Sequence, residues 1–234
     1  MGMELEDARV LIAGATGELG SALARRLTEE NCELALLGRD PERLAALADE
    51  LGAVSARFDA GDRRGIPPAV DAVAAGLGGL DSAVVASGVA AFGRADELEH
   101  DELEQTFAVN ALAPIALLSA ALRHLPEDGA VVGVTAIVAD HPTAGIASYS
   151  AAKAAFSAYL AVLRRERRRG GGTVLDVRPP HMDTGFTGRA LTGAPPPLPE
   201  PVDHDEVAAE IVAALRDGRR ELAWDLEARR LVAR

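Results

Sequence analysis

Residues 9–20 read Arg9-Val-Leu-Ile-Ala-Gly14-Ala-Thr-Gly17-Glu-Leu-Gly20, an apolar run that passes through three spaced glycines into a more polar segment. A short apolar run bounded by a glycine turn is typical of a buried parallel strand, here Arg9–Ala13, and a helix over Glu18–Glu30 is expected to follow. Glycines at such a turn allow close approach of a pyrophosphate, and the helix N-terminus offers it free N–H groups. The stretch therefore predicts a dinucleotide site; the alternative is a simple turn.

The same alternation of apolar runs and helix-like stretches continues along the chain. Further strands are predicted over Leu34–Leu37, Val54–Phe58, Ser82–Ala86, Ala130–Thr135 and Thr173–Val177. Helices are predicted over Pro41–Leu51, Ile66–Leu77, Ser148–Arg169 and His204–Asp217, and two more within Asp96–Leu125, broken near Pro114. Regular β-α alternation predicts an α/β fold with a doubly wound parallel sheet and helices on both faces.

Length and composition set limits on the class of protein. The chain has 234 residues, 48% hydrophobic and 3% aromatic, and a net charge of −12. We expect a single domain over 1–234 with an aliphatic core. We expect no nucleic-acid partner, because binding to nucleic acid requires a basic face. A lone Cys32 and five scattered histidines predict neither a disulfide nor a metal site. The N-terminus carries no signal-peptide pattern and no apolar run is long enough to span a membrane, so the expectation is a cytoplasmic protein with no membrane partner.

Tyr149-Ser-Ala-Ala-Lys153 lies in an alanine-rich run that should be helical. Residues four apart share one helix face, so an ammonium lies beside a phenol. A nearby positive charge lowers the pKa of a tyrosine and makes it a general acid/base near neutral pH. The alternative is that Tyr149 packs in a core while Lys153 is solvated.

The second strand ends in Leu37-Gly38-Arg39-Asp40. An acid about 20 residues after the glycines favours NAD, whereas an arginine there accommodates the 2′-phosphate of NADP. Asp40 precedes Pro41 and is explained as a helix N-cap. Arg39 has no such local role, so NADP(H) is favoured and NAD(H) is the less favoured alternative.

Taken in order, these motifs resemble the short-chain dehydrogenase/reductase family, and the similarity covers nearly all 234 residues. The matching residues are the glycine turn, Asp59, Ala86-Ser-Gly88, Asn110, Tyr149 with Lys153, and Arg178-Pro-Pro-His-Met-Asp-Thr184. The resemblance implies a Rossmann-type sheet and catalytic roles for Tyr149, Lys153 and Asn110. Tyr149 would exchange a proton with the substrate oxygen, Lys153 would hold the nicotinamide ribose and depress the tyrosine pKa, and Asn110 would hold a proton-relay water.

The resemblance also implies a set of cofactor contacts. Besides Tyr149 and Lys153 these are Gly14, Thr16, Gly17, Glu18, Leu19, Gly20, Arg39, Asp59, Ala60, Ala86, Gly88, Pro179, Met182 and Thr184. Asp59 and Ala60 would touch the adenine, Ala86 and Gly88 the cofactor ribose, and the last three the carboxamide and pyrophosphate.

The chain departs from the family pattern at several positions. The glycines are spaced G-x-x-G-x-x-G, Ala86 replaces an asparagine that helps brace the sheet, and Pro180 replaces a glycine and removes a backbone donor. Thirteen residues before Tyr149 the family has a serine that hydrogen-bonds the substrate oxygen, and this chain has Ala136. Adjacent Thr135 should face the other side of the strand, and the alternative is that a shift at the strand end brings it into the site. Loss of one such donor costs on the order of 10²–10³ in rate.

A composition shift occurs at Gly185–Pro201, which contains Ala194-Pro-Pro-Pro-Leu-Pro-Glu-Pro201. This run can be neither an ordinary helix nor a central strand. We expect a substrate lid over residues 185–203; the alternative is an extended surface connection.

These patterns together predict an NADP(H)-dependent oxidoreductase that interconverts a carbonyl and a secondary alcohol, with Tyr149 as general acid/base. One alternative is an NADP(H)-binding sensor or scaffold with little turnover, which Ala136 favours. Another is a non-redox dehydratase, cyclase or epimerase using the same pocket. The resemblance further implies a homodimer or homotetramer built through Asn110–Leu125 and Ser148–Arg169.

Overall fold

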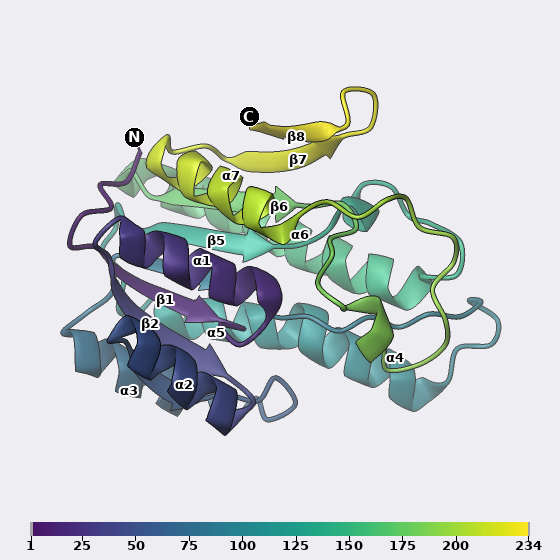
Figure 1. Ribbon diagram of the computed structural model, residues 1–234, viewed down its shortest axis with the longest axis horizontal. Coiled ribbons are helices and arrows are strands. Elements are labelled where there is room, and N and C mark those ends of the chain that lie inside the picture. The colour runs from purple at the N-terminus through teal and green to yellow at the C-terminus, as the bar shows by residue number, and fades with distance from the viewer. Residues whose placement is uncertain (1, 234) are drawn as a thin grey trace.

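A computed structural model describes residues 2–233 as one α/β domain around an eight-stranded sheet (Figure 1). The strand order is β3-β2-β1-β4-β5-β6-β7-β8. The strands are β1 (Arg9–Ala13), β2 (Glu33–Gly38), β3 (Val54–Arg57), β4 (Ser82–Val85), β5 (Ala130–Val134), β6 (Thr173–Arg178), β7 (Glu221–Asp225) and β8 (Arg230–Ala233). All neighbours pair in parallel except β7 and β8, which pair antiparallel.

Helices cover both faces of the sheet (Figure 1). They are α1 (Glu18–Glu29), α2 (Pro41–Leu51), α3 (Ile66–Leu77), α4 (His100–Phe107), α5 (Ala113–Ala121), α6 (Ala147–Arg167) and α7 (His204–Arg216). Alternate residues of the strands point to opposite faces. Ile12 therefore packs in a core with α1, α2 and α7, while Leu11 packs in a second core with α3, α5 and α6. The doubly wound sheet with helices on both faces is confirmed.

The six predicted strands and the helices are present, and the bounds of α2 and α3 match the prediction. Asp40 caps α2 as expected, its Oδ1 accepting from the N–H groups of Glu42 and Arg43 at 3.1 Å each. The sequence did not predict β7 and β8. They form an edge hairpin that is only half-buried, so it carries no continuous apolar run.

The strand order places the carboxyl ends of β1, β2, β4, β5 and β6 along one edge of the sheet. The order reverses between β1 and β4, because β1 leads to β2 on one side and the chain then returns to β4 on the other. In open α/β sheets ligands bind at this reversal, outside the carboxyl ends. The glycine turn follows β1 and Ala86–Gly88 follows β4, so both predicted cofactor segments meet there.

A π-helical turn, η1 (Ala108–Leu112), joins α4 to α5 in place of the predicted break. Pro114 has no N–H, so the Asn110 carbonyl lacks its ordinary α-helical donor, and the chain widens by one residue here. The joined stretch His100–Ala121 is long and apolar enough to cross a membrane by length and composition, which the sequence reading did not anticipate. Part of this stretch packs in the core, where Leu117 and Leu118 are fully buried, and a core helix passes the same test.

Candidate active site

The glycine turn between β1 and α1 is packed too tightly for side chains at two of its three glycines. Gly14 has φ +85°, and a Cβ there would lie 2.8 Å from the backbone nitrogen of Ser87. A Cβ on Gly20 would overlap the Gly14 carbonyl. The turn therefore lies against the end of β4 on one side and against its own helix on the other.

Gly17 differs from the other two glycines because its Cβ position faces open space apart from the Gly14 oxygen at 3.4 Å. It is the N-cap of α1, and no side chain from the described residues caps the helix there. The N–H groups of the first turn are therefore free of side-chain acceptors, and the helix dipole adds positive potential. These features fit a phosphate group at Gly17, beside Glu18 and Leu19.

The carboxyl ends of β2 and β3 form the next part of the edge. A Cβ on Gly38 would lie 2.7 Å from the Thr16 methyl carbon, so the glycine turn and the end of β2 are in contact. Arg39 is exposed, and no side-chain contact of its guanidinium is found within residues 2–233. The Asp59 carboxylate accepts from the Gly61 N–H at 2.9 Å and caps its own loop, and Ala60 packs partly buried against the second core.

Tyr149 and Lys153 lie one turn apart on α6, with the Lys153 Nζ 5.8 Å from the centroid of the tyrosine ring. Lys153 is 3% exposed and donates from Nζ to the Val134 carbonyl at 3.0 Å, so the solvated alternative is excluded. Burial lowers the pKa of Lys153 to about 8, partly opposed by the negative charge of Asp176. Burial raises the pKa of Tyr149 above its ordinary value. The pKa of Tyr149 therefore shifts in the opposite direction to the predicted lowering, and desolvation of the phenol is the cause.

Gly88 brings the end of β4 against the predicted catalytic residues. A Cβ there would lie 3.0 Å from the Asn110 Oδ1 and 3.4 Å from the Lys153 Nζ. The Asn110 Oδ1 accepts from the Val89 N–H at 3.1 Å, and its Nδ2 donates to the carbonyls of Val89 and Thr106. The Asn110 side chain is thus engaged in holding this loop.

Ala136 is buried and follows β5. The adjacent Thr135 does not supply the hydroxyl that the family's serine would offer. The Thr135 Oγ1 lies 2.6 Å from the Asp176 Oδ1 and 3.0 Å from the Val177 carbonyl. Its one proton is committed to these acceptors on β6. The structure therefore leaves the serine position without a hydroxyl.

Phe186 is a site residue that the sequence reading missed. Its ring packs on Tyr149 with centroids 5.9 Å apart, and its Cε2 lies 3.7 Å from the Cβ position of Gly88. It belongs to a small apolar cluster built on buried residues from two loops, Ala90, Phe92 and Ile146, with Val138, Phe186 and Ala190 packed against them. The available signal was an aromatic residue within a segment already read as a lid, in a chain with 3% aromatics.

The segment after β6 forms a long loop whose two ends are joined by a bridge between Met182 and Val202. Within it, Leu191 donates to the Ala90 carbonyl at 2.8 Å, and Phe92 donates back to the Thr192 carbonyl at 3.0 Å. The segment thus lies across the loop after β4 and beside Tyr149. No ordinary helix forms in its proline-rich half.

The three predicted cofactor contacts after β6 lie at the start of this segment. The Pro179 carbonyl accepts from the Ile137 N–H at 2.9 Å, and Met182 packs against the first core. The Thr184 N–H donates to the Met182 carbonyl at 2.9 Å. Pro179 is thereby tied to the segment that carries Ala136.

A doubly wound sheet, an uncapped glycine turn and a Tyr/Lys pair at the sheet reversal define a dinucleotide-dependent oxidoreductase as the class of protein. Residues 8–193 match the family model described as short chain dehydrogenase. The chain belongs to the short-chain dehydrogenase/reductase family.

Relatives and solved structures agree with this membership. A curated relative, the cyclic-di-GMP-binding biofilm dispersal mediator protein of Escherichia coli strain K12, is 33% identical over 177 residues, covering 75% of this chain and 73% of the relative. A short chain dehydrogenase from Burkholderia cenocepacia in complex with NADP has a TM-score of 0.81 and 29% identity, with 92% of each chain covered. An alcohol dehydrogenase from the archaeon Thermococcus sibiricus complexed with 5-hydroxy-NADP has a TM-score of 0.83 and 26% identity, covering 92% of this chain and 95% of that one.

Proposed function

We propose that the protein is an NADP(H)-dependent oxidoreductase that interconverts a carbonyl and a secondary alcohol. The observation that carries this proposal is the meeting of Gly88, Asn110, Lys153 and Tyr149 at the sheet reversal, beside a turn that suits a phosphate. NADPH, when bound, supplies the hydride; the protein supplies position and the proton.

Tyr149 is the proton donor for reduction. Because burial raises its pKa, the phenol is protonated at neutral pH and available to a carbonyl oxygen. Lys153, with a pKa of about 8, is mostly protonated at pH 7 and stabilises the phenolate that the transfer leaves. One of its three protons is used on Val134, which leaves two for other acceptors such as a ribose hydroxyl.

NADP(H) is proposed over NAD(H) for two reasons. Arg39 stands exposed at the end of β2 while Asp40 is occupied as a helix cap. An arginine at this point pairs well with a 2′-phosphate. Similar structures from Burkholderia cenocepacia and Thermococcus sibiricus were solved with NADP or a derivative of it.

The proposed substrate is an apolar carbonyl compound or alcohol. The apolar cluster of Phe92, Val138, Ile146 and Phe186, whose Phe186 ring packs on Tyr149, would form the substrate wall, and none of these side chains offers a hydrogen bond. Residues 185–203 act as the lid that completes this wall. We also propose a homodimer or homotetramer through Asn110–Leu125 and Ser148–Arg169, where Leu112 of η1 and Val162 of α6 are exposed apolar residues.

The test is NADPH oxidation by the wild type and Tyr149→Phe across a panel of apolar ketones and aldehydes. We expect turnover by the wild type and a loss of at least about 100-fold in kcat for Tyr149→Phe, with NADPH still bound by both proteins. Equal inactivity of both proteins, with NADPH still bound, would rule out the enzyme.

A nucleotide-binding sensor with little turnover is the second candidate. It is favoured by the absence of a hydroxyl at Ala136 and the commitment of Thr135 to Asp176. The Escherichia coli relative is itself named for binding cyclic-di-GMP. Binding of that dinucleotide by calorimetry, together with no turnover on the panel, would favour this reading. Product formation without a change in NADPH absorbance would indicate a non-redox enzyme instead.

A further inference from the structure

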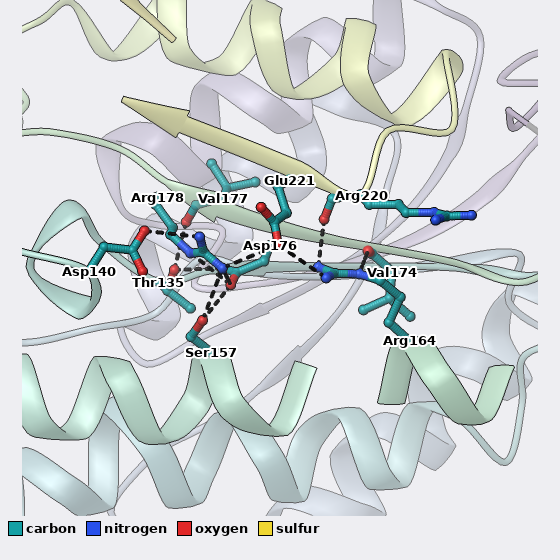
Figure 2. A network of polar contacts seen from close by, with 10 residues as sticks. All are labelled: Thr135, Asp140, Ser157, Arg164, Val174, Asp176, Val177, Arg178, Arg220 and Glu221. Carbon is teal, nitrogen blue, oxygen red and sulfur yellow. Dashed lines mark hydrogen bonds and ion pairs between the residues drawn. The ribbon is translucent and has the colours of Figure 1, made fainter. Parts of the chain in front are cut away.

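A buried polar network lies directly behind the proposed active site, between α6 and the strands β6 and β7 (Figure 2). Its centre is Asp176, which is 1% exposed. The Asp176 carboxylate accepts from Thr135 and Ser157 at 2.6 Å each, and from Arg178 at 2.8 and 3.0 Å. A buried carboxylate with this many charge-assisted and hydroxyl donors is held in one position.

Arg178 extends the network to Asp140, at the end of the segment that follows β5. From β6 its Nη1 donates to the Asp140 Oδ2 at 2.9 Å, while Nε and Nη2 hold Asp176 (Figure 2). The guanidinium also lies 3.6 Å from the Glu221 carboxylate. Its side chain is 15% exposed, so the guanidinium is largely shielded from water. Its planar fork of donors hydrogen-bonds two carboxylates at the same time.

Asp140 and Thr135 are the two ends of one short segment. Between them lie Ala136, where the family has its substrate-binding serine, and the 3₁₀ turn Ile137–Ala139. Val138 from this turn packs in the apolar cluster that contains Phe186, which in turn packs on Tyr149. The backbone fixes the near end, since Thr135 donates to the Val177 carbonyl at 2.8 Å. Arg178 is the side chain that fixes the far end.

We propose that Arg178 is a positioning residue for the active site. It clamps the segment Thr135–Asp140 at both ends, directly through Asp140 and indirectly through Asp176, and so fixes the pocket wall at Ala136 and Val138. The same network reaches α6 through Ser157, which continues the four-residue spacing of Tyr149 and Lys153. The clamp thus sets the wall of the pocket against the helix that carries the catalytic pair. The inference rests on the proposed function, because it assigns that wall to the substrate.

The clamp gives a role to Arg178, the last residue of β6, and to Pro179, the first residue after it. The arginine holds Asp140, and the Pro179 carbonyl accepts from the Ile137 N–H at 2.9 Å, so two consecutive residues of β6 and its loop bind the same segment. A lysine at 178 has one point charge and lacks the fork that spans two carboxylates.

The test compares Asp140→Asn with Glu221→Gln as a matched control. Both replace one carboxylate bound to Arg178 by its amide, but Glu221 makes no hydrogen bond or ion pair with residues 135–140 among the described contacts. The Asp140 side chain is 42% exposed, so its replacement should leave the protein folded. The readouts are kcat and KM for an apolar ketone, the Kd for NADPH, and amide hydrogen exchange over residues 136–146.

For Asp140→Asn we expect KM to rise about 3–10-fold, with kcat and the NADPH Kd within about two-fold of wild type, because a lost wall contact weakens substrate binding without removing a reacting group. Exchange over 136–146 should become faster, since the amides of Ala139, Asp140 and His141 are bonded within this turn. Glu221→Gln should change neither KM nor exchange over 136–146. Arg178→Lys should act in the same direction, and adding Asp140→Asn to it should have little further effect.

Identical KM and exchange for Asp140→Asn and the wild type would overturn the clamp, as would equal effects from Glu221→Gln. The exchange measurement separates this proposal from the proposed function. If the wild type turns over no carbonyl while exchange over 136–146 still responds to Asp140→Asn, the clamp stands and the reductase assignment fails. If the wild type turns over a carbonyl but Asp140→Asn changes neither KM nor exchange, the reductase assignment stands and the clamp fails.

Discussion

Lys153 is the only lysine in the chain and is buried beside Tyr149, so its charge should leave a measurable mark on stability. Burial lowers its pKa from 10.5 to about 8. Replacement by methionine keeps the length of the side chain and removes the titrating group. The prediction is therefore a pH-dependent difference in unfolding free energy between the wild type and Lys153→Met.

The sign and size follow from proton linkage. Between pH 8 and 10.5 the unfolded chain keeps the Lys153 proton and the folded protein has lost it, so the unfolding free energy of the wild type rises with pH there. A pKa difference of about 2.5 units corresponds to about 3 kcal/mol. Below pH 8 the cost of burying the charge is fully present, and Lys153→Met is relieved of it. The unfolding free energy of Lys153→Met, measured relative to that of the wild type, should therefore fall by about 3 kcal/mol as the pH rises to 10.5.

The assay is urea unfolding of both proteins without cofactor, at a series of pH values from 7 to 10.5. Lys153→Met also loses the hydrogen bond to Val134, but a neutral amine still donates, so this loss of about 1 kcal/mol is nearly independent of pH. Phe156→Leu, in the buried face of the same helix, is the control whose effect should not depend on pH. A constant difference between wild type and Lys153→Met would refute the reasoning, and the single ¹³Cε lysine resonance would then titrate near 10.5.

Three further changes test individual parts of the site. Arg39→Asp should weaken NADPH binding about 10- to 100-fold, the value of a hydrogen bond to a charged group, and spare NADH; equal wild-type affinities for both cofactors, by fluorescence titration, would contradict this. Gly20→Ala should destabilise the protein by about 2–3 kcal/mol in urea unfolding because its Cβ overlaps the Gly14 carbonyl, whereas Gly17→Ala should fold normally and lose NADPH affinity; equal stability of the two variants would count against the packing argument. Ala136→Ser should raise kcat for ketone reduction by about 10-fold or more by restoring a donor to the substrate oxygen, and an unchanged kcat would show that another group already serves.

Much of this fold could be predicted because its signals are local. A parallel strand such as β5 is buried on both faces and therefore reads as an unbroken apolar run, Ala130–Thr135. The α2 boundary follows from Asp40 and Pro41, whose capping roles depend only on their neighbours. The cofactor turn could likewise be read from Gly14–Gly20, since its backbone geometry needs glycine.

What could not be predicted depends on contacts between distant segments. Phe186 reaches Tyr149 only because the segment after β6 crosses the loop after β4. Asp176 and Arg178 appear in the sequence as an alternating pair in a strand, and nothing local indicates that Thr135 and Asp140 complete them. The pKa of Tyr149 was predicted in the wrong direction because helix spacing gives the distance to Lys153 but not the depth of burial.

The central claim is that Tyr149 and the bound cofactor reduce a carbonyl by hydride and proton transfer. Its most direct test is NADPH carrying deuterium at the transferred position, incubated with an apolar ketone, followed by mass spectrometry of the alcohol. We predict one deuterium on the carbinol carbon of the wild-type product and none above background with Tyr149→Phe. An unlabelled product from the wild type, or equal label from both proteins, would contradict the assignment.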